Sequence, residues 1–205
     1  MEYYDENLQQ TWSEKDSFTE ERYLQFSEYI KEGQTVLDIG CNTGIGGATL
    51  KLNNPSVKIY GVELIKERVE IIPTNIYEEI YNESIITTNC NSKTFDIILA
   101  GELIEHIPPK LFVDMLYNCK NLLNDDGLIL FTTPNPNSWL VKLGRDSVFS
   151  DPSHVNIMSI KEFKNIVLST NLNVIEIKGS GKASRYLGYS FPISLYGSYM
   201  SVLKK

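Results

Sequence analysis

The stretch Val36-Leu37-Asp38-Ile39-Gly40-Cys41-Asn42-Thr43-Gly44 decides the fold of this chain. Its apolar part, Thr35–Ile39, is typical of a buried strand. Gly40 and Gly44 follow at once, and glycine, which has no Cβ, lets the backbone turn tightly and approach a ligand closely. A helix is expected to continue through Ala48–Asn53, with its first N–H groups facing that ligand. The stretch therefore predicts a strand, a binding turn and a helix in succession.

Outward from this stretch, short apolar runs alternate with longer amphipathic ones. Further strands are predicted at Lys58–Val62, Ser84–Thr88, Phe95–Ala100, Leu128–Thr133, Val174–Ile177 and Met200–Leu203. Helices are predicted before Gly33, over residues 64–82 with a break at Pro73, from Glu102, at Phe112–Leu123, and at Ser159–Ser169 with Ser159 and Glu162 as a capping box. This alternation predicts an α/β fold, a mostly parallel sheet with helices on both faces.

The length of 205 residues suits one domain over 1–205, with a helical or lid segment at 1–31, a core at 34–178 and a C-terminal segment with the last strand at 179–205. In the first segment, Tyr3, Tyr4 and Trp12 could close over a bound ligand, or they could pack as an ordinary surface helix. The spacing of the aromatic residues does not separate these two interpretations.

Charge and composition narrow the partners. A net charge of −7 argues against general nucleic-acid binding and favours a small-molecule acceptor. The chain has no apolar run near the roughly 18 residues of a membrane span, and its acidic N-terminus is unlike a secretory signal. The three cysteines, at 41, 90 and 119, lack metal-type or redox-type spacing, which suits a reducing compartment. We expect a cytoplasmic protein without membrane association, and composition does not predict its oligomeric state.

A carboxylate follows the second predicted strand. Glu63 comes directly after Lys58–Val62 and 23 residues after Gly40. At that place a carboxylate can accept hydrogen bonds from both hydroxyls of a ribose. A glycine-rich turn alone occurs in many α/β proteins, so the turn and Glu63 have to be taken together. Together they predict a site for a nucleoside-containing ligand.

The order of residues resembles one family. Asp38 within the strand, followed by Gly-Cys-Asn-Thr-Gly, resembles motif I of class I, Rossmann-like, S-adenosylmethionine-dependent methyltransferases, usually Leu-Asp-x-Gly-Cys-Gly-x-Gly. It differs from the Gly-x-Gly-x-x-Gly of nicotinamide enzymes. Phe95-Asp96-Ile97-Ile98 and Leu128–Thr133 match the family in order and spacing, so the resemblance covers about residues 34–178. It implies a methyltransferase with a seven-stranded sheet whose last strand is antiparallel.

The resemblance also implies which residues hold S-adenosyl-L-methionine. Glu63 would bind the ribose, and the other cofactor contacts would be Asp38, Gly40, Cys41, Asn42, Thr43, Gly44 and Gly101. Asn42 stands where the family usually has its middle glycine, and asparagine is the residue that best tolerates a positive φ after glycine. The acidic residue that the family commonly places near the adenine has no clear counterpart. The adenine contact therefore stays unassigned.

A second motif, Glu102-Leu103-Ile104-Glu105-His106, follows the strand at Phe95–Ala100. On a helix, at about 100° per residue, Glu102, Glu105 and His106 share one face. His154 is the only other histidine, and it lies after the next strand. We expect these four side chains to converge on a divalent metal such as Mg²⁺ or Mn²⁺, with Fe²⁺, Co²⁺ or Zn²⁺ as alternatives. The pattern is similar to the metal sites of methyltransferases acting on small-RNA 3′ ends and in ubiquinone biosynthesis.

A metal-free interpretation stays open. In it, glutamate closes a helix N-terminus and His106 or His154 acts as the general base. The expected reaction is methyl transfer to the oxygen of a sugar, nucleotide-sugar or phosphorylated polyol. A quinone or phenol precursor and an RNA 3′ end are the alternative acceptors. A module that binds S-adenosylmethionine without catalysis is the alternative of another class, and the intact face of Glu102, Glu105 and His106 argues against it.

Overall fold

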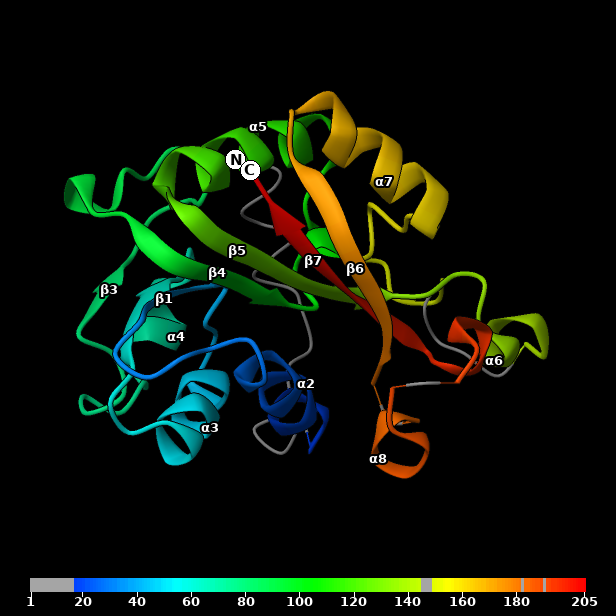
Figure 1. Cartoon of the computed structure of the whole chain (residues 1–205), viewed down its shortest axis with the longest axis horizontal. Helices are drawn as coiled ribbons and strands as arrows, with labels where there is room; N and C mark the ends of the chain where they lie inside the picture. The colour runs from blue at the N-terminus through cyan, green and yellow to red at the C-terminus, as the bar shows by residue number, and fades with distance from the viewer. Residues whose placement is uncertain (1–16, 145–148, 182, 190) are drawn as a thin grey trace.

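The computed structural model describes residues 17–144, 149–181, 183–189 and 191–205. They form a seven-stranded sheet in the order β3-β2-β1-β4-β5-β7-β6 (Figure 1). The strands are β1 Thr35–Ile39, β2 Lys58–Val62, β3 Glu79–Tyr81, β4 Phe95–Gly101, β5 Leu123–Pro134, β6 Asn173–Ser180 and β7 Ser198–Lys204. β7 runs antiparallel to both β5 and β6, and the other neighbours pair in parallel. The expected fold class, with an antiparallel last strand, is confirmed.

Helices cover both faces of the sheet. The α-helices are α2 Ser17–Ser27, α3 Ile45–Asn53, α4 Lys66–Val69, α5 Pro109–Leu122, α6 Trp139–Lys142, α7 Ile160–Ser169 and α8 Ser184–Leu187, and the 3₁₀ turns are η1 Cys90–Ser92, η2 Ile104–His106 and η3 Ile193–Leu195. α2 and α3 pack on one face, where Phe26 and Leu50 are buried. α5 and α7 pack on the other, where Phe112 and Phe163 are buried (Figure 1). Apolar side chains thus fill two cores, one on each side of the sheet.

The helix α7 begins where its sequence signal predicts. The Ser159 hydroxyl accepts a hydrogen bond from the N–H of Glu162, while the Glu162 carboxylate accepts one from the N–H of Ser159. This capping box satisfies two N–H groups that the helix itself leaves without partners. Its prediction from the sequence is confirmed.

The third strand lies elsewhere than predicted. Residues 64–82 hold only the four-residue helix α4, and then β3 pairs with β2 at Glu79–Tyr81. The predicted strand at Ser84–Thr88 is a turn, and Asn118 explains why. The Asn118 amide donates hydrogen bonds to the carbonyls of Ile85 and Thr88, at 2.7 and 2.8 Å. Those carbonyls therefore need no hydrogen bonds from a neighbouring strand. The long-range contact with Asn118 outweighs the strand preference of the local β-branched residues.

The predicted helix from Glu102 is also wrong. Glu102 has a φ of +52°, which is left-handed, and its N–H donates to the carbonyl of Thr132 at 3.0 Å. A single 3₁₀ turn, η2, follows, and Ile107 is extended because proline at 108 disfavours a helical residue before it. α5 begins only at Pro109, a position where proline is favoured. Glu102, Glu105 and His106 therefore do not share a helical face, contrary to the prediction.

Part of the predicted organisation lies outside the described residues, namely the lid residues Tyr3, Tyr4 and Trp12. The division of the chain at 1–31, 34–178 and 179–205 stays a prediction. Within the described ranges, no helix has both the length and the apolar character that crossing a bilayer requires.

Candidate functional site

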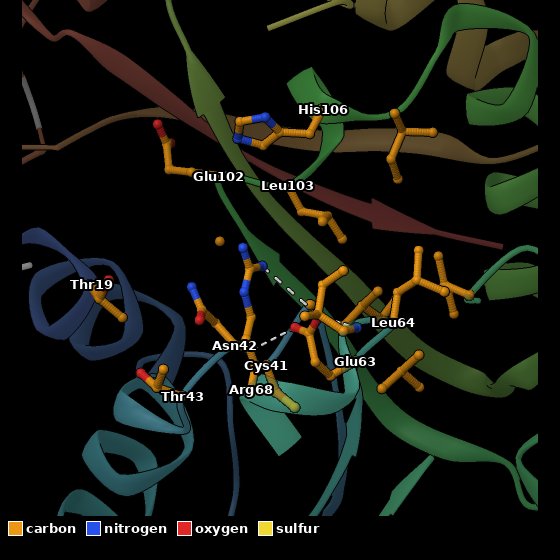
Figure 2. A pocket seen from close by; sticks show the side chains of 18 of the residues that line it. Thr19, Cys41, Asn42, Thr43, Glu63, Leu64, Arg68, Glu102, Leu103 and His106 are labelled. Atoms are coloured by element: carbon orange, nitrogen blue, oxygen red, sulfur yellow. Dashed lines mark hydrogen bonds and ion pairs between the residues drawn. The ribbon is translucent and has the colours of Figure 1, made fainter. Parts of the chain in front are cut away.

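A cavity of about 500 Å³ opens at the carboxyl ends of the central strands. The strand order reverses between β1 and β4, the place where open α/β sheets bind ligands. Segments that follow β1, β2 and β4 line the cavity together with α2 (Figure 2). The loop after β5 completes the lining. Its volume lies in the range of small-molecule sites.

The glycine turn forms the floor of this cavity. Gly40, Asn42 and Gly44 have φ values of +67°, +49° and +85°, so the turn needs three left-handed residues. The N–H groups of Gly40 and Cys41 donate to the carbonyl of Val62, at 2.8 and 3.2 Å, and join the turn to the end of β2. Asn42 adopts the positive φ that its sequence position predicts.

Glu63 is buried and held in a single orientation. Its Oε2 accepts a hydrogen bond from the N–H of Asn42 and its Oε1 from the N–H of Ile65, both at 2.9 Å. Arg68 lies 3.9 Å from Oε1 (Figure 2). Each carboxylate oxygen can accept a second hydrogen bond. Glu63 therefore keeps the capacity to accept two ligand hydroxyls without moving.

Most of the predicted cofactor contacts line the cavity: Gly40, Cys41, Asn42, Thr43, Glu63 and Gly101. Asp38 and Gly44 are not among its lining residues, and their contact with the cofactor stays a prediction. Asp38 is fully buried and accepts hydrogen bonds from the hydroxyls of Tyr23 and Tyr77, at 2.6 and 2.7 Å. Burial raises the pKa of Asp38 to about 7, although both phenol hydrogen bonds oppose the rise. Its geometry makes it a support behind the turn.

Three of the four predicted metal ligands do come together. One ligand atom each from Glu105, His106 and His154 lies within 4.8 Å of the others, and the two imidazole rings are 4.9 Å apart. We call these three residues the Glu-His-His cluster. β4 and β5 are neighbours as predicted, and the loop after β5 folds back onto η2: His106 Nδ1 is 3.1 Å from the Ser153 carbonyl, and the Asn156 N–H donates to the Glu105 carbonyl at 2.9 Å.

The buried side chains of this cluster have perturbed acidities. Burial, and then the negative charge of Glu102, raise the pKa of Glu105 well above its usual range. Burial, and then the charge of His154, lower the pKa of His106 to about 4, so His106 is neutral at pH 7. Because the Ser153 carbonyl can only accept, His106 Nδ1 carries the proton and Nε2 keeps a free lone pair.

The Glu-His-His cluster fits a divalent cation. Glu105 Oε2 accepts a hydrogen bond from the Thr133 hydroxyl at 3.1 Å, whereas Oε1 is buried without a hydrogen-bond partner in the described part of the chain. An unpartnered buried carboxylate oxygen is costly unless a ligand completes it. Metal bonds of about 2.0–2.6 Å allow ligand atoms to lie about 4–5 Å apart, close to the separation found here.

Glu102, the fourth predicted ligand, is absent from the cluster. Its Oε1 lies 3.6 Å from Nε of Arg22, and its Oε2 accepts a hydrogen bond from the Ser198 hydroxyl at 3.2 Å. The left-handed backbone at Glu102 explains this, since the spacing argument assumed a helix. Glu102 nevertheless lines the same cavity as the other three residues.

Two cationic residues of the cavity were missed by the sequence reasoning. Arg22 comes from α2 and Arg68 from α4, and both are largely buried at the cavity wall. Figure 2 shows Arg68 beside Glu63. Arg22 precedes Tyr23, whose hydroxyl donates to Asp38, and no local signal in the sequence placed Arg22 beside Glu102. Arg68 lies in α4, the short part of the predicted 64–82 helix that does form, and no local signal placed its side chain at the cavity.

Known proteins resemble this chain in sequence. A family model described as a methyltransferase domain matches residues 4–177. A ubiquinone biosynthesis O-methyltransferase of Actinobacillus pleuropneumoniae is 30% identical over 123 residues, covering 55% of this chain and 51% of that protein. One from Paraburkholderia xenovorans is 27% identical over 164 residues, 72% of this chain and 68% of that protein. The chain thus spans about half the length, 51%, of the first of these relatives.

Solved structures share the fold. A SAM-dependent methyltransferase from Archaeoglobus fulgidus superimposes with a TM-score of 0.69 at 19% identity, covering 91% of this chain and 92% of that one. A small RNA methyltransferase superimposes with a TM-score of 0.72 at 19% identity, covering 96% of this chain and 26% of that one. At these identities the superpositions speak for the architecture alone.

Proposed function

Because this chain belongs to the S-adenosylmethionine-dependent methyltransferase family, we propose that it methylates an oxygen of a small hydroxylated acceptor with the help of a divalent cation. The acceptor class we propose is a sugar, a nucleotide-sugar or a phosphorylated polyol. One observation carries the proposal: the Glu-His-His cluster borders the same cavity as the glycine turn and Glu63. A nucleoside site and an oxygen-activating site therefore meet in one space.

The cofactor would lie along the turn. Glu63 would accept the ribose hydroxyls with the capacity left on its two oxygens, and the backbone of Gly40–Thr43 would face the methionine end. That end carries a carboxylate, and Arg22 is the guanidinium that α2 places at this side of the cavity. Guanidinium and carboxylate pair through two parallel charged hydrogen bonds. Arg22 is therefore our proposed partner for the cofactor carboxylate.

The reaction is a displacement at carbon. S-adenosylmethionine supplies the methyl group: the acceptor oxygen forms the new C–O bond while the S–CH₃ bond breaks and leaves its electron pair on sulfur. The protein has to align the two reactants and remove the proton of the attacking hydroxyl. Tyr23 and Asp38 fix the turn from behind, while η2 and the loop after β5 would present the Glu-His-His cluster to the acceptor. Alignment thus comes from β1 and deprotonation from the end of β4.

Glu105, His106 and His154 would hold the cation, and Glu102 lines the same cavity. When bound, the cation would coordinate oxygens of the acceptor and lower the pKa of the attacking hydroxyl. His106 is a poor general base on its own, because burial holds its pKa at about 4. If the reaction proceeds without metal, His154 is the better candidate to take the proton. The buried, unpartnered Oε1 of Glu105 favours the metal-assisted route.

A turnover screen tests the proposal. Methyl transfer from labelled S-adenosylmethionine would be followed against sugars, sugar nucleotides, phosphorylated polyols and catechols, before and after chelation and with Mg²⁺ or Mn²⁺ restored. We expect one hydroxylated class to be methylated only when the divalent cation is present. Turnover that survives chelation unchanged would contradict the metal assistance. Methylation of a nitrogen or a carbon in preference to oxygen would contradict the oxygen specificity.

A quinone or phenol precursor is the second candidate acceptor, because the curated relatives carry the name ubiquinone biosynthesis O-methyltransferase. The catechol arm of the screen addresses it. An RNA 3′ terminus is a less favoured acceptor, because general RNA binding requires a basic face and this chain has a net charge of −7.

A further inference from the structure

Glu102 stands between two partners at the end of β4. Its backbone is fixed, because its N–H donates to the Thr132 carbonyl at 3.0 Å in a left-handed conformation. Its side chain is not committed in the same way. Oε1 faces Arg22 at 3.6 Å, beyond hydrogen-bond distance, and Oε2 accepts one neutral hydrogen bond from Ser198 at 3.2 Å. Rotation of this side chain therefore breaks only a weak ion pair and one hydroxyl contact.

The Glu-His-His cluster lies close to Glu102. Glu102 and all three residues of the cluster line one cavity, and Figure 2 shows Glu102 and His106 at its wall. Oε1 of Glu102 and Oε1 of Glu105 are both buried without a hydrogen-bond partner among the described residues. Two carboxylates repel each other in a low-dielectric site, and a cation between them removes the repulsion. A cation bound to the cluster would therefore favour Glu102 as an additional ligand.

The ion pair with Arg22 keeps the Glu102 carboxylate away from the cluster. The Arg22 guanidinium is also the partner proposed for the cofactor carboxylate. A bidentate pair with that carboxylate is stronger than the 3.6 Å contact with Glu102. The two carboxylates compete for one guanidinium, so the binding of one weakens the hold on the other.

We infer that the cofactor carboxylate displaces Glu102 from Arg22, and that the freed Glu102 completes the cation site formed by Glu105, His106 and His154. This inference rests on the proposed function and adds a regulation to it. Cation affinity is low in the empty enzyme, where three side chains form the site, and rises once the cofactor is bound. By linkage the cation raises cofactor affinity by the same factor. The acceptor hydroxyl is then activated only when a methyl donor is in place.

The test is calorimetric titration of Mn²⁺ into the full chain in three states: without ligand, with saturating S-adenosylhomocysteine, and with saturating 5′-methylthioadenosine. S-adenosylhomocysteine keeps the carboxylate, whereas 5′-methylthioadenosine has the same nucleoside without it. We expect Mn²⁺ to bind about tenfold more tightly with S-adenosylhomocysteine, within the usual range of coupling between sites. We expect no such gain with 5′-methylthioadenosine. The reciprocal titration of S-adenosylhomocysteine, with and without Mn²⁺, should show the same factor and needs no variant.

The variants sharpen the test. In Glu102→Gln, S-adenosylhomocysteine should still bind but should no longer tighten Mn²⁺, while the matched variant Glu83→Gln, another acid of the cavity wall, should keep the full coupling. Equal Mn²⁺ affinity in all three states of the wild type overturns this inference and leaves the metal-assisted function intact. Equal gains with both nucleosides also overturn it. Failure of Mn²⁺ to bind in any state overturns the inference and the metal part of the proposed function together.

Discussion

The two halves of the cavity are built in different ways. The cofactor half, which is the Gly40–Gly44 turn with Glu63, consists of segments directly after β1 and β2, tied by backbone hydrogen bonds to Val62 and by the N–H of Asn42. The acceptor half, which is the Glu-His-His cluster, depends on Ser153 and on a loop about 50 residues away in the chain. Neighbouring strands determine the first half, and long-range docking determines the second. The first should tolerate changes in the second.

The largest expected effect separates the halves by function. His154→Ala removes an imidazole of the acceptor half, and loss of such a group typically lowers turnover by about 10²–10⁴-fold. Measured without divalent cation, S-adenosylhomocysteine affinity should change by less than about twofold, because His154 belongs to the acceptor half of the cavity. Turnover on the acceptor found by the screen and calorimetry of the same preparation check this. A loss of cofactor affinity as large as the loss of turnover would show that the halves are one unit.

The next effect concerns the support of the cofactor half. Burial raises the pKa of Asp38 to about 7 in the folded protein, against about 4 when unfolded. As pH rises from 4 to 7, the unfolded chain releases this proton while the folded protein keeps it. Asp38 therefore costs up to about 4 kcal/mol of stability across that window. The stabilisation that comes from keeping Asp38 protonated is fully present below pH 4 and is lost as the pH rises through 7.

Asp38→Asn removes this titration and keeps most of the size of the side chain. Urea unfolding of both proteins at several pH values between 4 and 8 gives the measurement. The wild type should lose more stability than the variant as pH rises, by a few kcal/mol. Parallel curves for the two proteins would mean that Asp38 is ionised throughout and that the hydrogen bonds of Tyr23 and Tyr77 outweigh its burial.

A smaller effect is expected at the ribose contact. Glu63→Ala should weaken S-adenosylhomocysteine by about 1–3 kcal/mol, the scale of hydrogen bonds to a charged group. Binding of Mn²⁺ to the cofactor-free protein should stay within about twofold, because Glu63 belongs to the other half. Calorimetry with each ligand separately measures both. Unchanged cofactor affinity would mean that another residue holds the ribose.

The sequence predicted the cofactor half well because its information is local. The strand, the glycine turn and Glu63 follow from spacing, and even the positive φ of Asn42 was expected from its residue type. Asp38 was the exception. Its hydrogen bonds from Tyr23 and Tyr77, which are distant in the chain, were not predicted.

For the acceptor half, the sequence predicted the residues of the Glu-His-His cluster but not the backbone conformation that carries them. Proximity of β4 and β5 brought His106 and His154 together as expected. The helix assumed from Glu102 does not form, since prolines at 108 and 109 allow only one 3₁₀ turn before α5. Those prolines were visible in the sequence and should have limited the helix. The pairing of Glu102 with Arg22, by contrast, requires the packing of α2 and has no local signal.

The most direct test of the account is a crystal structure grown with Mn²⁺ and S-adenosylhomocysteine, with the ion located by its anomalous scattering. We expect one Mn²⁺ within about 2.0–2.6 Å of side-chain atoms of Glu105, His106 and His154, with S-adenosylhomocysteine on the glycine turn and its ribose on Glu63. A structure with S-adenosylhomocysteine in place and no anomalous peak at these three residues would contradict the central claim. The acceptor half would then have to work by acid–base chemistry alone.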